Sequence, residues 1–396
     1  MRSSFLPFSP PSLGNEEIDE VVDTLRSDWI TTGPKVKRFE QEFAQYLGAS
    51  AAVAVSSATD AMLVALAALG VGPGDEVITT PMTFCSTVHV IEHVGARPVL
   101  ADIEPDTLTI DPEQVKRAIT PRTKAIMPVH LYGHPCEMDR LLELARLHRL
   151  ALVEDAAHAF PARYKGRLIG SAGSNLQPVT FKRQLTAFSF YATKNLTTAE
   201  GGMLTGDPDL IEQARLWSLH GMSRDAYARY SAEGSWYYEV VLPGYKCNMT
   251  DIQAALGLQQ LRKLAGFQAR RRAIVQQYEA ALAALPELQV PVERAEAEHA
   301  WHIYALRLNL ERLTIDRARF IEELKLRNIG TSVHFIPIHL QPYYRDKYGW
   351  RPEDFPIAYH EYRRLISLPL YPRLCDQDVA DVIEAVRDVV EQYREG

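Results

Sequence analysis

The residue of this sequence whose type and setting best suit it for chemistry is a lysine in the segment SFYATKNLTTAEGG, residues 189–202. Lys194 follows a strand-like apolar run, residues 185–190, and precedes a pair of glycines. In a water-poor cleft, burial lowers the pKa of a lysine, and the neutral amine can attack a carbonyl carbon to form a Schiff base. The alternative is a solvated loop charge without chemical function. The residues that accompany Lys194 decide between the two.

Two other segments offer groups for a phosphate and for a ring nitrogen. In SSATDAM, residues 56–62, Ala58 and Thr59 supply backbone N–H groups and a hydroxyl at the start of a predicted helix, where a phosphate is stabilised. The alternative there is an ordinary helix N-cap. In VEDAAHA, residues 153–159, Asp155 can pair with a protonated ring nitrogen, and the alternative is a carboxylate that caps the next helix.

An aromatic ring and a second hydroxyl complete the set. Phe84, in PMTFCST, can stack on a flat ring, although a core position is the alternative. Ser189, five residues before Lys194, can reach a phosphate. A lysine, a carboxylate, a ring stacker and a phosphate cradle are together the parts of a pyridoxal 5'-phosphate (PLP) site. Their co-occurrence predicts PLP as the cofactor.

The elements that position these residues follow an α/β pattern from about residue 50 to 205. Short apolar runs alternate with longer helical stretches, which predicts a mostly parallel sheet covered on both faces. Ligands of such a sheet lie at the carboxyl ends of the strands, and the four segments above fall there. The predicted strands cover residues 51–56, 76–80, 97–103, 124–130 and 151–156.

A second, smaller α+β domain is predicted for the C-terminal part. Residues 251–285 form one long helical pattern, and a helix of that length is expected to bridge two domains. The boundary is placed near residue 260, which gives a large domain of 1–260 and a small domain of 261–396, with the first 20 or so residues packed on the small one. The remaining predicted features are helices at 208–219, 316–327 and 376–393, strands at 300–308 and 331–335, and a surface loop or extended hairpin at 174–184.

Composition excludes several classes of protein. The net charge is −7 and no basic cluster is present, so no nucleic-acid partner is expected. The four cysteines include no CxxC pair, which argues against a disulfide framework and a metal site and favours a cytoplasmic setting. The longest apolar run, residues 61–72, is shorter than the roughly 20 residues that cross a bilayer, so no membrane association is expected.

On these motifs the chain resembles the DegT/StrS family of sugar aminotransferases, over essentially its whole length. The resemblance implies the type I fold of PLP-dependent aminotransferases, and it is strongest to the branch that makes UDP-4-amino-4-deoxy-L-arabinose. Besides the segments quoted above, it includes WITTGPKVKRFEQEFAQYLG (29–48), TPRTKAIMPVHLYG (120–133), PGYKCNMTDIQAALG (243–257), GTSVHFIPIH (330–339) and SLPLYP (367–372).

The resemblance also implies a role for each site residue. Lys194 becomes the Schiff-base lysine and later the proton carrier, and Asp155 keeps the pyridine nitrogen protonated. His158 contacts the phenolic oxygen or the lower face of the ring, and Phe84 covers the opposite face. The phosphate is bound by Ala58, Thr59 and Ser189.

A shared active site is implied as well, and with it at least a homodimer. In many relatives an asparagine of a GYN motif reaches the phosphate of the neighbouring subunit; here that position is Lys246, with Asn248 two residues further on. Thr32 and His334 match segments that border the sugar pocket. The alternative for His334 is a structural histidine at a strand end, with its hydrogen-bonding groups paired within the protein. The segment 174–184 is longer than the connection expected there.

The reaction expected from the resemblance is a ping-pong transamination. An amino donor, L-glutamate, gives its amine to the cofactor, and a nucleotide-linked 4-ketosugar, with a UDP-sugar favoured, then receives it. The alternatives are transamination at the 3-position of a dTDP- or GDP-ketosugar, and a non-catalytic regulatory relative that binds PLP and a nucleotide sugar. A nicotinamide dehydrogenase is disfavoured because no GxGxxG follows the first predicted strand.

Overall fold

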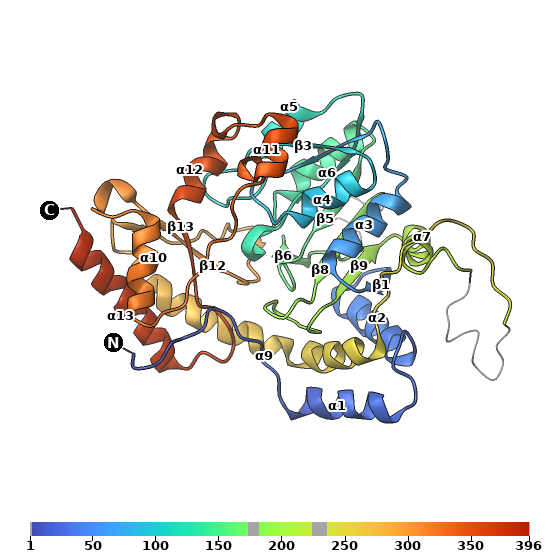
Figure 1. Cartoon of the computed structure of the whole chain (residues 1–396), viewed down its shortest axis with the longest axis horizontal. Helices are drawn as coiled ribbons and strands as arrows, with labels where there is room; N and C mark the ends of the chain where they lie inside the picture. Colours follow the sequence, from blue (N-terminus) through green and yellow to red (C-terminus); the bar gives the residue numbers. More distant parts are fainter. Residues whose placement is uncertain (1, 173–181, 224–235, 396) are drawn as a thin grey trace.

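The computed structural model describes residues 2–172, 182–223 and 236–395. Figure 1 shows a large domain built on a central sheet, a smaller domain beside it, and the long helix α9 (Asp251–Leu282) running beneath both. Most of the predicted loop at 174–184 lies outside the described residues, and strand β8 begins at its last position, Gln184. No helix in the described ranges is long and apolar enough to cross a membrane.

The central sheet has seven strands, and six of them run in the same direction. The exception is β9, which pairs antiparallel with both of its neighbours. Because β8 and β9 are antiparallel neighbours, the connection between them stays at one edge of the sheet, and this connection carries Lys194. In spatial order the strands are β1 (Ala51–Val55), β9 (Gly202–Gly206), β8 (Gln184–Ser189), β5 (Ala151–Asp155), β4 (Thr123–Ile126), β2 (Glu76–Thr79) and β3 (Arg97–Leu100).

Helices cover both faces of this sheet, and most of its strand residues are therefore buried. One core contains Phe39, Phe43 and Leu258, and the other contains Leu66 and Ile211. The helices over the first core are α2 (Pro34–Leu47), α5 (Pro112–Ala118), α6 (Met138–Leu147) and the first half of α9. Those over the second are α3 (Ala58–Ala68), α4 (Ser86–His93) and α7 (Pro208–Ser218).

Helix α9 links the two domains. It begins with a capping box, in which Thr250 accepts the N–H of Gln253 and Gln253 accepts the N–H of Thr250. Along its length it changes core: Leu264 packs under the large sheet, whereas Ile274 belongs to the core of the small domain. The large domain therefore gives way to the small one within a single helix.

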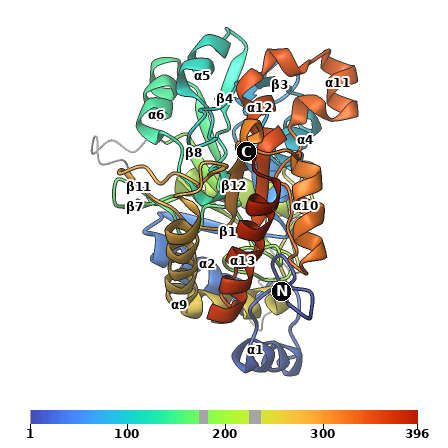
Figure 2. The same ribbon diagram turned by 90° about the vertical axis from the view of Figure 1, so that its left-hand side faces the viewer.

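The small domain is an antiparallel sheet with helices beside it. The strands, in spatial order, are β10 (Leu288–Gln289), β12 (Tyr304–Leu308) and β13 (Leu365–Leu368). In Figure 2 this domain faces the viewer, and α13 packs against α9 and α10. The remaining elements are α10 (Arg317–Leu326), α11 (Pro342–Tyr348), α12 (Pro356–Arg364), α13 (Asp376–Tyr393), the N-terminal helix α1 (Asn15–Arg26), and a small sheet of β11 (Ala297–Glu298), β6 (Arg163–Tyr164) and β7 (Arg167–Leu168).

The strand predicted at 331–335 is wrong. Only Ser332 forms a β-bridge, with Ser367, and the chain then leaves the sheet. The next residues turn toward the large domain, where the Tyr132 hydroxyl donates to the carbonyl of His334. A short run of Thr, Ser and Val suits any extended segment, so its composition did not separate a strand from an extended loop.

Candidate active site

A cavity of about 510 Å³ opens at the carboxyl edge of the large sheet. Its size falls within the usual range for a small-molecule site. Most of the residues predicted from sequence line it, and they come from five separate segments of the chain. These residues are Ala58, Thr59, Phe84, Asp155, His158, Ser189, Lys194 and His334.

Lys194 lies in the connection between β8 and β9, which is held in place from both domains. The neighbouring Asn195 donates hydrogen bonds to the carbonyls of Phe160, at 3.0 Å, and Ala300, at 2.8 Å. Gly202 allows the connection to close, because a Cβ there would lie 2.4 Å from the carbonyl carbon of Ser57. The lysine side chain is thereby aimed into the cavity rather than into solvent.

The Lys194 amine faces the cavity and makes no hydrogen bond or salt bridge among the described residues. Burial lowers the pKa of Lys194 to about 8, against a smaller opposing attraction from the Asp155 carboxylate. A partly buried amine with a lowered pKa can act as a nucleophile and as a proton acceptor. The solvated-charge interpretation of this lysine does not hold.

Asp155 ends β5 and is almost completely buried. Its Oδ2 accepts a hydrogen bond from the Thr87 hydroxyl at 2.8 Å, and its Oδ1 accepts one from the Ala157 N–H at 3.1 Å. Burial nevertheless raises the pKa of Asp155, although these two bonds and the charge of Lys194 oppose the shift. The carboxylate therefore lacks a full complement of partners, and a cationic N–H in the cavity would supply one.

His158 is held in one tautomer by the backbone. The N–H of Tyr132 donates to His158 Nδ1 at 3.2 Å, so that nitrogen must carry the lone pair. Burial, with a smaller contribution from the positive charge of Lys194, holds the pKa of His158 well below its usual range. The ring is therefore neutral, its Nε2 carries the hydrogen, and it can donate to an anionic oxygen in the cavity.

The start of α3 borders the cavity and offers groups that suit a phosphate. Ser57 is the N-cap, and its Oγ accepts the N–H of Asp60 at 3.0 Å. The cap is therefore Ser57, so the hydroxyl of Thr59 and the first N–H groups of the helix, including that of Ala58, are left for a ligand. Ser189 adds a further hydroxyl from the end of β8.

Aromatic side chains from both domains flank the cavity. Phe84 is 55% exposed, which excludes the core position that the sequence left open. Its ring centroid lies 5.6 Å from that of Phe335 in the small domain. Phe84 and the small residue Ala157 both line the cavity, so an aromatic face and a small residue are available to a flat ring there.

A cofactor of the PLP type fits this set of groups. The cavity provides an unpartnered amine, an under-satisfied carboxylate, a neutral imidazole donor, an exposed aromatic face and a helix N-terminus. Each of these matches one part of the cofactor: the aldehyde, the pyridine nitrogen, the phenolic oxygen, the ring face and the phosphate.

The small domain contributes two further histidines. His334, which the sequence predicted, lines the cavity; its Nδ1 lies 2.8 Å from Ser367 Oγ, and burial lowers its pKa to about 4. His302 was not predicted, yet it lines the cavity too, with its ring 4.6 Å from that of His158. It lies just before β12 in a segment that the sequence analysis assigned to the strand itself, which hid its position.

Three predicted residues lie elsewhere. Thr32, Lys246 and Asn248 are not among the residues that line the cavity of their own chain. They form a separate cluster, in which Asn248 Nδ2 donates to Thr32 Oγ1 at 2.6 Å and Lys246 Nζ donates to Asn248 Oδ1. Their roles toward a neighbouring subunit or a sugar stay predictions.

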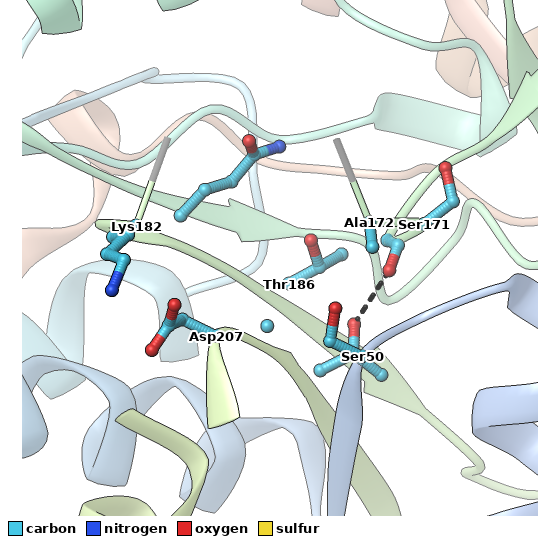
Figure 3. A pocket seen from close by; sticks show the side chains of 10 residues that line it. Ser50, Ser171, Ala172, Lys182, Thr186 and Asp207 are labelled. Atoms are coloured by element: carbon cyan, nitrogen blue, oxygen red, sulfur yellow. Dashed lines mark hydrogen bonds between the residues drawn. The ribbon is translucent and has the colours of Figure 1, made fainter. Parts of the chain in front are cut away.

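Figure 3 shows a smaller cavity, of about 50 Å³, that does not belong to this site. Ser50 precedes β1, Gln184 begins β8 and Asp207 follows β9, so this cavity lies at the opposite edge of the sheet. It is far too small for a cofactor together with a substrate.

Comparisons with known proteins agree with this geometry. The profile of the DegT/DnrJ/EryC1/StrS aminotransferase family matches residues 11–387. The spore coat polysaccharide biosynthesis protein SpsC of Bacillus subtilis (strain 168) is 53% identical over 391 residues, which are 98% of each chain.

Two solved structures have the same fold. The putative sugar aminotransferase Spr1654 from Streptococcus pneumoniae, in its PMP form, is 38% identical with a TM-score of 0.89, over 98% of this chain and 99% of that one. DesV of S. venezuelae, in complex with a ketimine intermediate, is 37% identical with a TM-score of 0.86, also over 98% and 99% of the two chains. The predicted family, fold type and cofactor are confirmed. The chain therefore belongs to the DegT/DnrJ/EryC1/StrS aminotransferase family, and it is a PLP-dependent aminotransferase.

Proposed function

We propose that this enzyme moves an amino group from L-glutamate to the 4-keto carbon of a nucleotide-linked sugar, with a UDP-sugar as the favoured acceptor. The observation that carries the proposal is the Lys194 amine, which makes no hydrogen bond or salt bridge to the residues that the structure describes and shares one cavity with Asp155 and a helix N-terminus. When bound, PLP withdraws electrons from the bond that is broken at the substrate carbon. The remaining steps depend on residues of this chain.

Lys194 is proposed to hold the cofactor and then to move the proton at the substrate carbon. The lowered pKa of about 8 gives this amine a larger neutral fraction near neutral pH than an ordinary lysine has, which suits a proton acceptor. Asp155 is proposed to keep the ring nitrogen protonated. His158 is proposed to donate from Nε2 to the phenolic oxygen.

The substrate class is supported by the relatives, because SpsC takes its name from polysaccharide biosynthesis and Spr1654 is described as a putative sugar aminotransferase. His334 is proposed to contact the sugar from the small domain, and its pKa of about 4 makes it a neutral hydrogen-bonding group at working pH. Amination at the 3-position of a dTDP- or GDP-ketosugar is the second candidate.

We further propose a homodimer in which Lys246 or Asn248 reaches the cofactor phosphate of the partner. Helix α1 supports this, because its polar Glu17 is buried against α9 while Ile18 and Leu25 face outward, 57% and 55% exposed. An apolar face turned to solvent above a polar inner face indicates a surface that another chain covers. The segment that begins at Trp236, near the shared-site residues in sequence, is exposed and apolar as well.

Reduction and peptide mapping test the central assignment. Borohydride treatment of PLP-saturated protein is expected to fix the cofactor on the peptide that contains Lys194, and a label on any other lysine would contradict the assignment. A panel of UDP-, GDP- and dTDP-linked 3- and 4-ketosugars, supplied with glutamate, then identifies the acceptor. Amine product from the UDP-4-ketosugar alone is the expected result, and product from a 3-ketosugar alone would favour the second candidate.

Subunit mixing tests the shared site. Lys194→Ala and Lys246→Ala homodimers are each expected to be nearly inactive, whereas exchange of their subunits should restore one competent site in each mixed dimer. Asn248→Ala replaces Lys246→Ala in the same scheme if the Lys246 variant keeps its activity. Recovery of no activity on mixing, with dimers confirmed by ultracentrifugation, would show that each site is built from one chain.

A further inference from the structure

A chain of two threonine hydroxyls leads to the Asp155 carboxylate. Thr87 Oγ1 lies 2.8 Å from Asp155 Oδ2, and Thr83 Oγ1 lies 2.7 Å from Thr87 Oγ1. Thr87 is completely buried and Thr83 is 2% exposed. Both threonines lie between β2 and the first turn of α4, on the same stretch of chain that presents Phe84 to the cavity.

The two hydrogen bonds that link Thr83, Thr87 and Asp155 have one possible direction when Asp155 is ionised. A carboxylate only accepts hydrogen bonds, so the single hydroxyl hydrogen of Thr87 must point to Asp155. The oxygen of Thr87 is then the acceptor for the hydroxyl of Thr83. Each hydroxyl polarises the next, which strengthens the bond that reaches the carboxylate.

The direction matters because Asp155 has few other partners. The N–H of Ala157 is the second donor to the carboxylate within the described part of the chain. Burial favours the neutral acid, and a neutral acid cannot hold a pyridinium N–H as an ion pair. The threonine chain opposes that tendency and also fixes the rotation of the carboxylate about its Cβ–Cγ bond.

We propose that Thr87, oriented by Thr83, is a positioning residue that keeps the Asp155 carboxylate ionised and aimed at the cofactor's ring nitrogen. This inference rests on the proposed role of Asp155 and adds to it. Neither threonine was singled out by the sequence, in which they read as loop and helix-cap residues.

Four variants test the proposal. Thr87→Val removes the hydroxyl and keeps the shape, Thr87→Ser restores a hydroxyl, and Thr83→Val removes the orienting donor at a position that also lines the cavity. Thr79→Val is the matched control: Thr79 is also completely buried, but its hydroxyl donates to the carbonyl of Met127 at 2.8 Å. The readouts are the ¹⁵N chemical shift of ring-labelled PLP bound to each variant, followed from pH 6 to 9, and single-turnover proton abstraction from glutamate.

In Thr87→Val, the ring nitrogen is expected to lose its proton at a lower pH than in the parent, and proton abstraction should slow by roughly ten- to a hundredfold, the usual worth of one hydrogen bond to a charged group. Thr87→Ser should recover both readouts, and Thr83→Val should show a smaller change in the same direction. Thr79→Val should leave the ¹⁵N titration unchanged, whatever its effect on thermal stability.

A parent-like ¹⁵N titration in Thr87→Val overturns the inference, as does a failure of Thr87→Ser to recover it. If Thr87→Val does not fold, the same titration in Thr83→Val decides the outcome. Asp155→Asn separates this result from the proposed function. If the ring nitrogen loses its proton in Asp155→Asn but not in Thr87→Val, only the positioning role of the threonines is refuted. If ring protonation is unchanged in Asp155→Asn, the proposed role of Asp155 itself is refuted.

Discussion

The last two residues of β5 are both buried carboxylates, and they differ in what surrounds them. Glu154 points away from the cavity, and its two oxygens accept hydrogen bonds from His130 at 2.9 Å, Gln184 at 2.8 Å and Thr186 at 2.7 Å. Asp155 points into the cavity and has one hydroxyl and one backbone N–H. Burial alone would raise both pKa values, but the pKa of Glu154 is lowered by its hydrogen bonds, whereas that of Asp155 stays raised.

This difference teaches how to separate a structural charge from a functional one. Glu154 ties β5 to β8 and to His130, in the segment that follows β4, and its hydrogen-bonding needs are met within the protein. Asp155 has few partners in the described part of the chain and lies near an amine that makes no hydrogen bond or salt bridge there, an arrangement typical of a site that a bound group completes. Two carboxylates with similar burial thus have different roles: Glu154 stabilises the fold on one face of β5, and Asp155 faces the cavity on the other.

Removal of the amine should have the largest effect on function. Lys194→Ala is expected to lower kcat by at least about a thousandfold, because it removes both the cofactor's attachment and the proton carrier. Stopped-flow spectroscopy of the glutamate half-reaction measures this. Lys194→Arg keeps the charge but not the nucleophile and should be equally inactive. Substantial steady turnover in either variant would show that the amine is not the reacting group.

Substitutions of Asp155 and Glu154 should affect different properties, activity in the first case and stability in the second. Asp155→Asn is expected to lower kcat by roughly a hundredfold or more with little loss of stability, because it neutralises a poorly satisfied charge. Glu154→Gln is expected to cost about 3 kcal/mol in the free energy of unfolding, because it disrupts a buried network around a charge, with a smaller change in kcat. Urea unfolding and steady-state kinetics on both variants check this, and a reversed pattern would refute the comparison.

The lowered pKa of Lys194 predicts a pH dependence of stability in the cofactor-free protein. Between about pH 8 and 10.5 the unfolded chain binds a proton at this lysine that the folded chain does not, so this contribution to stability rises with pH over that window. Below pH 8 the penalty is complete, at up to about 3 kcal/mol. The gain in unfolding free energy of Lys194→Met over the parent should therefore shrink as the pH rises through this range. A pH-independent difference would show that Lys194 is not perturbed.

The stacking of Phe84 on the cofactor ring is expected to have the smallest effect among these predictions. Phe84→Leu is expected to weaken PLP binding by about three- to tenfold, the usual size of an aromatic stacking contribution. Fluorescence titration of the cofactor-free protein measures this. Leu196→Ala, in the buried core beside Lys194, is the matched control for packing and should reduce thermal stability more than Phe84→Leu does. An unchanged dissociation constant for Phe84→Leu would exclude stacking.

The central strands and most of the candidate site residues could be predicted because they depend on local sequence patterns. Continuous apolar runs predicted the central strands, and polar residues immediately after them marked the edge at which Asp155, Phe84 and Ala58 meet. The prediction failed where composition is ambiguous, at 331–335, and where a residue reaches the site from a distant segment. His302 and Thr87 are of the second kind, because nothing in their immediate sequence distinguishes them from ordinary strand or cap residues.

By itself, the sequence determined that β5 ends in two adjacent carboxylates on opposite faces, because side chains alternate along a strand. It also determined that Lys194 follows a strand and precedes a tight glycine connection. Only the tertiary structure decided which carboxylate meets a cavity and which meets His130, and that the Lys194 amine enters the same cavity as Asp155. The physical reason is that burial and hydrogen-bond satisfaction are properties of the neighbours, and here the neighbours come from segments as far apart in the sequence as Ala58 and His334.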